Sequence, residues 1–190
     1  MSDVDRPSGQ AKDDRRRKRR RSNADALVVM LTLLAVALTA VALNAGRWGV
    51  PLFGFTNEHG SQCRNQWLGH RCTELTLAHV QHHVRAEFPT GTRLISGSWQ
   101  QTHDFELTAK VVYPRAVAAE GWSRLTEEYG ECRHRVPSPL DAEPDLSGVC
   151  VMTNIGGFGT GMAQDAEVWR ITTATQPDGD TVVDLLIRSR

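Results

Sequence analysis

The sequence predicts an α+β protein: one N-terminal transmembrane helix followed by a disulfide-stapled α+β sandwich. Three observations lead there. An uncharged apolar run at 26–43 follows a basic run, all four cysteines lie beyond it, and later patterns read α-β-β-α-β-β-β with a mostly antiparallel sheet. The expected regions are a disordered basic cytoplasmic arm (1–25), a transmembrane helix (26–46), a tether (47–62) and an extracytoplasmic α+β domain (63–190).

The apolar run suits a membrane span in length and composition. Its 18 residues include only two polar ones, Thr32 and Thr39, and it extends without charge to Gly46. At about 1.5 Å per residue, such a helix spans roughly 27–31 Å, close to the hydrocarbon thickness of about 30 Å. The residues that precede it carry an unbroken basic run: Arg15, Arg16, Arg17, Lys18, Arg19, Arg20 and Arg21. The positive-inside rule therefore places the N-terminus in the cytoplasm.

A cleaved signal peptide is the main alternative to this anchor. Ala40-Val41-Ala42 has the small-residue spacing of a cleavage site. Signal-peptide apolar regions usually run about 7–15 residues, so the longer run here favours an uncleaved anchor. Both interpretations place residues 44–190 outside the cytoplasm.

The zero net charge hides an asymmetry between the two ends of the chain. Residues 1–25 hold nine basic and five acidic residues, which leaves 13 basic and 17 acidic residues for the rest. With almost no apolar side chains, the arm is expected to be disordered. Its basic run is expected to act as a topology signal, and contact with anionic lipid headgroups is the functional alternative. Nucleic acid is not an expected partner, because the run adjoins a membrane helix.

The cysteines Cys63, Cys72, Cys132 and Cys150 predict disulfides, because an even number in an oxidising compartment normally pairs. Three connectivities are possible. We favour the local one, Cys63–Cys72 and Cys132–Cys150, because each pair brackets a turn-rich segment. Without a C-x-x-C pair, zinc binding by these cysteines is a poor alternative.

The outer domain begins with a predicted helix at 74–88, capped by Thr73 and ended by Pro89. Strands are expected at 92–100 and 104–113, joined as a hairpin by 101–103. Pro114 opens a second helix that runs to residue 129.

Three further strands are expected near the C-terminus, at 149–153, 166–175 and 181–187. The segment Pro177-Asp178-Gly179-Asp180 predicts a turn between the last two.

Part of this outline resembles small membrane-anchored envelope proteins of actinobacteria. The residues concerned are the Trp99 strand, the strand Phe105-Glu106-Leu107-Thr108-Ala109-Lys110 and the helix led by Pro114, within about residues 90–130. The resemblance implies an envelope location and no activity, so it assigns no functional residue.

Three histidines on the first predicted helix, His79, His82 and His83, form the main candidate site. Their i, i+3 and i+4 spacing places them in one arc, which could bind zinc or copper. The arc lies opposite the apolar face, so a solvated surface is the simplest interpretation, with a metal site or a pH-responsive surface as alternatives.

Other sequence patterns give weaker indications of a functional site. The glycine-rich segment 156–161 lacks the phosphate-loop spacing and is expected to be a hairpin loop. Ser96-Gly97-Ser98 lies in a predicted strand, and Glu127, Glu128 and Glu131 suit a solvated helix end. Five tryptophans suit core or interface packing.

The sequence therefore favours a single-pass membrane protein whose outer domain binds or scaffolds a cell-envelope component, protein or cell wall, without a cofactor. The alternative is a membrane-anchored envelope enzyme, metal-assisted at His79, His82 and His83. A sensor is a third hypothesis, weakened because 25 residues leave no room for a cytoplasmic domain.

Overall fold

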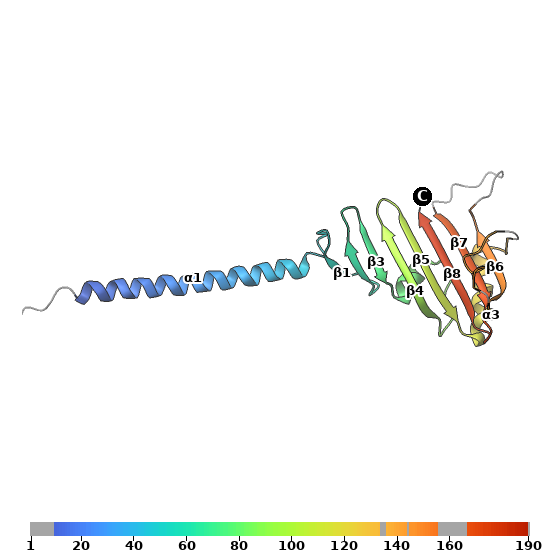
Figure 1. Cartoon of the computed structure of the whole chain (residues 1–190), viewed down its shortest axis with the longest axis horizontal. Helices are drawn as coiled ribbons and strands as arrows, with labels where there is room; N and C mark the ends of the chain where they lie inside the picture. Colours follow the sequence, from blue (N-terminus) through green and yellow to red (C-terminus); the bar gives the residue numbers. More distant parts are fainter. Residues whose placement is uncertain (1–9, 134–135, 144, 156–166, 190) are drawn as a thin grey trace, which may run out of the picture. The chain divides into compact units, whose positions relative to one another are not determined.

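The computed structural model describes residues 10–133, 136–143, 145–155 and 167–189, with side chains from residue 25 onward (Figure 1). The chain divides into two compact units, residues 1–48 and 49–190, which are treated separately below.

The first unit is the helix α1, Gln10–Asn44. Its segment Asp25–Asn44 has a mean hydropathy of 2.7 and is long and apolar enough to cross a membrane. The hydroxyls of Thr32 and Thr39 donate to carbonyls one turn earlier, at 2.9 and 2.8 Å, so neither is left unpaired on this apolar surface. The helix begins well before the expected boundary: residues 10–24, assigned to a disordered arm, continue it, whereas residues 1–9 lie outside the described chain.

The second unit is built on one antiparallel sheet of eight strands in the order β1-β2-β3-β4-β5-β8-β7-β6. The strands are β1 Gly54–Thr56, β2 Gln62–Asn65, β3 His70–Glu74, β4 Arg93–Gln101, β5 Phe105–Tyr113, β6 Ser147–Thr153, β7 Glu167–Thr175 and β8 Thr181–Ser189. Two local hairpins, β4–β5 and β7–β8, meet where β5 pairs with β8 along its whole length (Figure 1).

The helices α2 (Leu77–His83) and α3 (Ala118–Tyr129), the latter preceded by the short 3-10 turn η1 (Arg115–Val117), pack on the main hydrophobic core. The sheet side of this core is formed by residues of β5 and β8: Leu107, Val111, Leu185 and Ile187. Alternation along β5 sends Val112 to the other face, where the loop residue Leu140 covers it. The centre of the sheet is therefore buried on both faces.

Gly121 sets how closely α3 approaches the sheet. A Cβ at this position would lie 2.5 Å from the ring of Tyr113, a buried residue at the end of β5. Only glycine permits this contact without movement of the helix.

The α+β class, the mostly antiparallel sheet and the local disulfides Cys63–Cys72 and Cys132–Cys150 are confirmed. The C-terminal five strands also lie where the sequence predicts them, within about two residues at each end.

The N-terminal part of the domain requires correction. Three short strands, β1 to β3, precede α2, and β1 lies inside the segment expected to be a tether. Strands of three to five residues are too short to show an alternating pattern.

The first helix of the domain is also shorter than the predicted 74–88. Glu74 ends β3, Thr76 rather than Thr73 caps the helix, and Val84 is already extended. The side chain of Gln81 binds the chain beyond the helix instead, through Ala86 O and Phe88 N at 2.9 and 2.7 Å. The second helix begins at Ala118, after η1, rather than directly at Pro114.

Candidate functional site

The strongest candidate site is a pocket of about 420 Å³ in which five of the seven histidines of the chain gather. We call it the histidine pocket. It is lined by His59, His70, His79, His82, His83, Phe55, Asn57, Glu58, Trp99, Gln101 and Phe105. Among the described residues, no lysine or arginine lines it, so the pocket is aromatic and rich in imidazole groups.

Three separate elements bring these histidines together. His59 lies in the loop between β1 and β2, His70 begins β3, and the other three come from α2. Trp99 on β4 lies at the centre: its ring centroid is 4.7 Å from that of His70, 5.2 Å from His79 and 5.8 Å from His83. The ring of His59 covers His82 at 4.4 Å.

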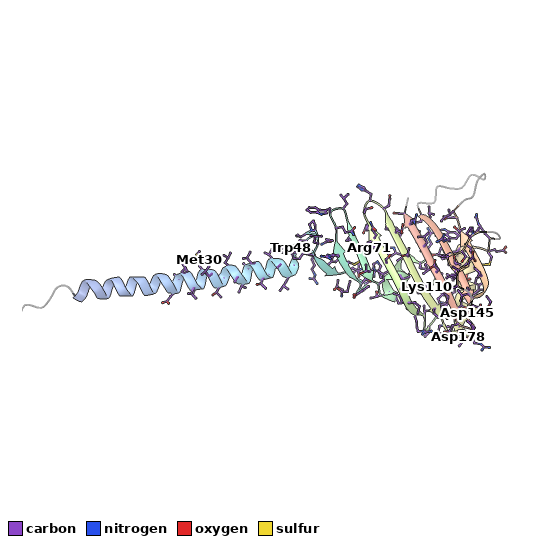
Figure 2. The ribbon with its side chains drawn as sticks, in the orientation of Figure 1. Met30, Trp48, Arg71, Lys110, Asp145 and Asp178 are labelled. Carbon is purple, nitrogen blue, oxygen red and sulfur yellow. A yellow bond between two sulfur atoms is a disulfide. The ribbon has the colours of Figure 1, made fainter. Side chains whose placement is uncertain are left out.

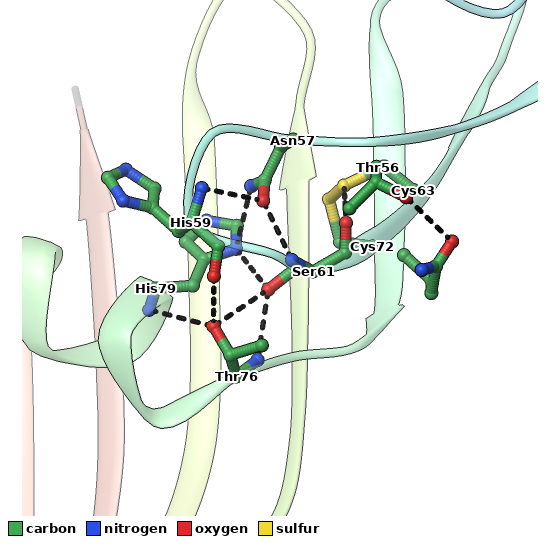
Figure 3. Close-up of a disulfide and its surroundings, with 9 residues drawn as sticks. Thr56, Asn57, His59, Ser61, Cys63, Cys72, Thr76 and His79 are labelled. Carbon is green, nitrogen blue, oxygen red and sulfur yellow. Dashed lines mark hydrogen bonds between the residues drawn. A yellow bond between two sulfur atoms is a disulfide. The ribbon is translucent and has the colours of Figure 1, made fainter.

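A polar network under the pocket holds His79 in place (Figure 3). The hydroxyl of Thr76 caps α2 by accepting from the backbone N–H of His79 at 3.2 Å, and donates to the carbonyl of His59 at 2.6 Å. Ser61 Oγ accepts from the backbone N–H of Thr76 at 2.9 Å. The β1–β2 loop and the start of α2 are thus bound to each other through side chains.

The same network determines which ring nitrogen of His79 carries the proton. Asn57 Oδ1 accepts from the backbone N–H groups of His59 and Ser61, at 3.1 and 2.8 Å, which leaves its amide nitrogen facing His79 Nδ1 at 3.0 Å. An amide nitrogen only donates, so Nδ1 must be the acceptor. Ser61 Oγ, 2.9 Å away, can donate to the same nitrogen. The neutral imidazole therefore carries its hydrogen on Nε2.

Burial and repulsion from neighbouring imidazoles keep His79 and His83 uncharged at neutral pH. Burial lowers the pKa of His79 to about 4, aided by the neighbouring His83, His59, His82 and His70. Burial likewise lowers the pKa of His83 to about 4, with His82 and His59 adding to the effect, and lowers that of His70. A proton on His79 Nδ1 would also face the donating amide of Asn57.

Trp99 contributes an unused hydrogen-bond donor. Its side chain is 7% exposed, and its indole Nε1 has no partner among the residues the structure describes. A buried N–H without a partner is costly, and such groups in native proteins call for an explanation. A ligand with an acceptor atom would supply one.

The structure brings the predicted residues His79, His82 and His83 together, and it adds His59 and His70, which the sequence did not single out. The expected solvated arc is wrong for His79, which is 1% exposed, and holds for His82. The cause is the unforeseen β1–β3 segment, which covers that side of α2. The three closely spaced histidines of α2 were the available signal, and no local pattern linked them to His59, His70 or Trp99.

Within the described chain, no group of three or more His, Cys, Asp or Glu side chains is arranged to hold a metal ion. His79 gives the reason at one position, since its Nδ1 is already engaged by Asn57 and Ser61.

The remaining candidates do not converge on a site. Segment 156–161 lies outside the described residues, and of the basic run at 15–21 only the helical backbone is described. Ser98 Oγ is bound to Thr108 Oγ1 across β4 and β5 at 2.9 Å, and Glu128 lies 3.8 Å from Arg85 at the exposed end of α3.

Compared with protein families, curated proteins and solved structures, the chain has no significant match. Its function must therefore be inferred from its own residues.

Proposed function

We propose that this chain is a single-pass membrane protein whose outer domain binds a cell-envelope component in the histidine pocket. Helix α1 supplies the anchor, with the basic run on the cytoplasmic side. The two disulfides support an oxidising location for the domain.

The observation that carries the proposal is the pocket around Trp99. It combines aromatic walls, a volume of about 420 Å³ and one buried donor, Trp99 Nε1, without a partner among the described residues, which are features of a small-ligand site. The indole N–H, which has no partner among the described residues, and the Nε2–H of the neutral His79 favour a ligand that presents hydrogen-bond acceptors. Stabilising networks rarely leave such a donor unused, which is why we assign the pocket to binding rather than packing.

Photo-crosslinking in intact cells tests the proposal. His82 lies exposed at the pocket and accepts a photoreactive residue without disturbing the core. Glu127, equally exposed on α3 and outside the pocket, is the matched control. We expect an envelope product at position 82 that is absent at 127 and reduced by Trp99→Phe. Equal labelling at the two positions would remove the support for the pocket.

Topology has its own test. Reporters fused at Met1 and Arg190 should report opposite sides of the membrane. Both on one side would contradict the orientation, and a mature chain beginning near Leu43 would identify a cleaved signal peptide instead.

A metal-assisted enzyme at His79, His82 and His83 is the alternative function. It would need His79 to give up its contacts with Asn57 and Ser61, or to release its Nε2 proton to water so that Nε2 could bind the metal. Binding of an envelope component requires neither change, and we therefore prefer the binding function.

A further inference from the structure

The hairpin between β2 and β3 carries two apolar side chains at its tip, where polar residues are usual. Trp67 is 83% exposed and Leu68 is 75% exposed. Turn positions normally hold Gly, Asn, Asp or Ser. Gly69 completes the turn with φ of +82°, and a Cβ there would collide with the carbonyl oxygen of Gln101. The fold therefore maintains this turn with its apolar residues outward.

A second exposed apolar segment lies directly beside this turn. The backbone N–H of Leu52 donates to the carbonyl of Asn65 at 2.9 Å, and Asn65 N–H donates to the carbonyl of Phe53 at 3.0 Å. Leu52 is 62% exposed. Its backbone has a φ of 71°, a conformation that residues other than glycine rarely adopt. We call the resulting surface the apolar tip: Leu52, Phe53, Trp67 and Leu68.

Basic residues adjoin the tip. Arg64 on β2 and Arg71 on β3 are direct cross-strand partners, both exposed, and Figure 2 labels Arg71 on its strand. Neither forms an ion pair with any residue in the described ranges. Like charges directly opposite each other destabilise a sheet unless something neutralises them. Anions held against this face would do so.

We propose that the apolar tip docks on the outer surface of the lipid bilayer, with Trp67 and Leu68 inserted at the interface and Arg64 and Arg71 on anionic headgroups. Exposed aromatic and aliphatic side chains next to cations are the composition that membrane interfaces retain. The inference rests on the membrane anchor of the proposed function.

Chain length supports lipid over other occupants. The candidate span ends at Asn44, and the domain begins at Gly49. Five extended residues reach at most about 18 Å, so the start of the domain stays near the bilayer. Leu52 and Phe53 follow within four residues of Gly49, which keeps the tip within reach of the same surface.

Depth-dependent fluorescence quenching on the full chain, reconstituted in phosphatidylcholine vesicles with added phosphatidylglycerol, tests this docking. All four native cysteines are in disulfides, so one introduced cysteine provides a single labelling site. Three labelled variants are compared: Leu68→Cys at the tip, Asp178→Cys at the exposed β7–β8 turn, and Leu34→Cys within α1. Spin-labelled lipids act as quenchers from the membrane and iodide from water.

We expect quenching by spin-labelled lipids to be severalfold stronger for the label at position 68 than for the label at position 178. The label at position 34 should be quenched by these lipids in every vesicle composition. Trp67→Ser should reduce the signal at 68. The pair Arg64→Gln and Arg71→Gln should abolish its dependence on phosphatidylglycerol.

Each contrary result would overturn a specific part of the proposal. If lipids quench the label at position 34 but quench position 68 no more than position 178, the docking proposal is wrong and the membrane anchor stands. If 34 is not quenched, the anchor fails, and docking fails with it. If 68 is shielded from both lipid and iodide, a protein or a second copy covers the tip, and the lipid proposal is wrong.

Discussion

Helices α2 and α3 pack on the same hydrophobic core, but they are held there by different forces. The 12-residue α3 buries Leu125 and Tyr129 and approaches Tyr113 through Gly121. The seven-residue α2 buries Val80 beside His79, and its first turn depends on Thr76, Ser61 and Asn57.

Apolar packing depends little on solution conditions, whereas a polar network around neutral histidines depends on their protonation. The α3 region therefore serves as the stable base of the domain. We expect the α2 region, with the histidine pocket, to be the part whose order responds to pH.

The largest expected effect concerns α3. Leu125→Ala removes a side chain that is fully enclosed between the helix and the sheet, and should lower the free energy of unfolding by about 2–5 kcal/mol. Denaturant titration measures the loss. Ser123→Ala, at an exposed position of the same helix, is the control and should change stability by less than about 0.5 kcal/mol. A similar loss in both variants would contradict the role of apolar packing.

The second prediction concerns pH and should separate the two helices. The pKa of His79 and His83 is about 4 in the folded domain against 6.5 for a free histidine, so the unfolded chain binds more protons between these values. Stability is therefore complete above about pH 6.5 and is lost as pH falls towards 4, by on the order of 1–3 kcal/mol. Hydrogen exchange should show this loss first in α2.

His79→Asn is the matched variant for this effect. Its Oδ1 can accept from Asn57 and Ser61 as Nδ1 does, while the titrating group is removed. The groups that face His79 in the pocket are His59, His70, His82, His83 and the carboxylate of Glu58. We expect a weaker pH dependence in α2 and no change in α3. Equal pH dependence in wild type and variant would show that His79 does not control it.

A smaller effect should distinguish the true helix cap from the predicted one. Thr76→Ala removes the cap of α2 and its contacts with His59 and Ser61, at a cost of about 1–2 kcal/mol. Thr73→Ala, on the exposed side of β3, should cost almost nothing. Thermal unfolding of the two variants provides the measurement, and the reverse order would restore the sequence-based assignment.

The smallest expected effect is in zinc binding. Because His79 Nδ1 is engaged, calorimetric titration with Zn²⁺ should give little heat, and the double variant His79→Ala/His83→Ala should behave like wild type. Tight binding that disappears in the variant would revive the metal-assisted alternative.

Sequence reasoning was most successful where patterns are long and local. The apolar run in α1, the alternation along β5 and the turn at 177–180 each lie within one segment, and both cysteine pairs close short loops. It failed at β1 to β3, because strands of three to five residues carry little pattern. That failure led directly to the wrong environment for His79.

The sequence by itself determined the candidate membrane segment and the α+β class and favoured the local pairing of the cysteines, because charge, hydropathy and local spacing are properties of neighbouring residues. Only the tertiary structure decided the environment of the histidines. The contact between Asn57 and His79 joins residues 22 positions apart, and Trp99 on β4 packs against His79. Since burial and hydrogen bonding among such distant residues set both the tautomer and the pKa, no local pattern could have revealed the pocket.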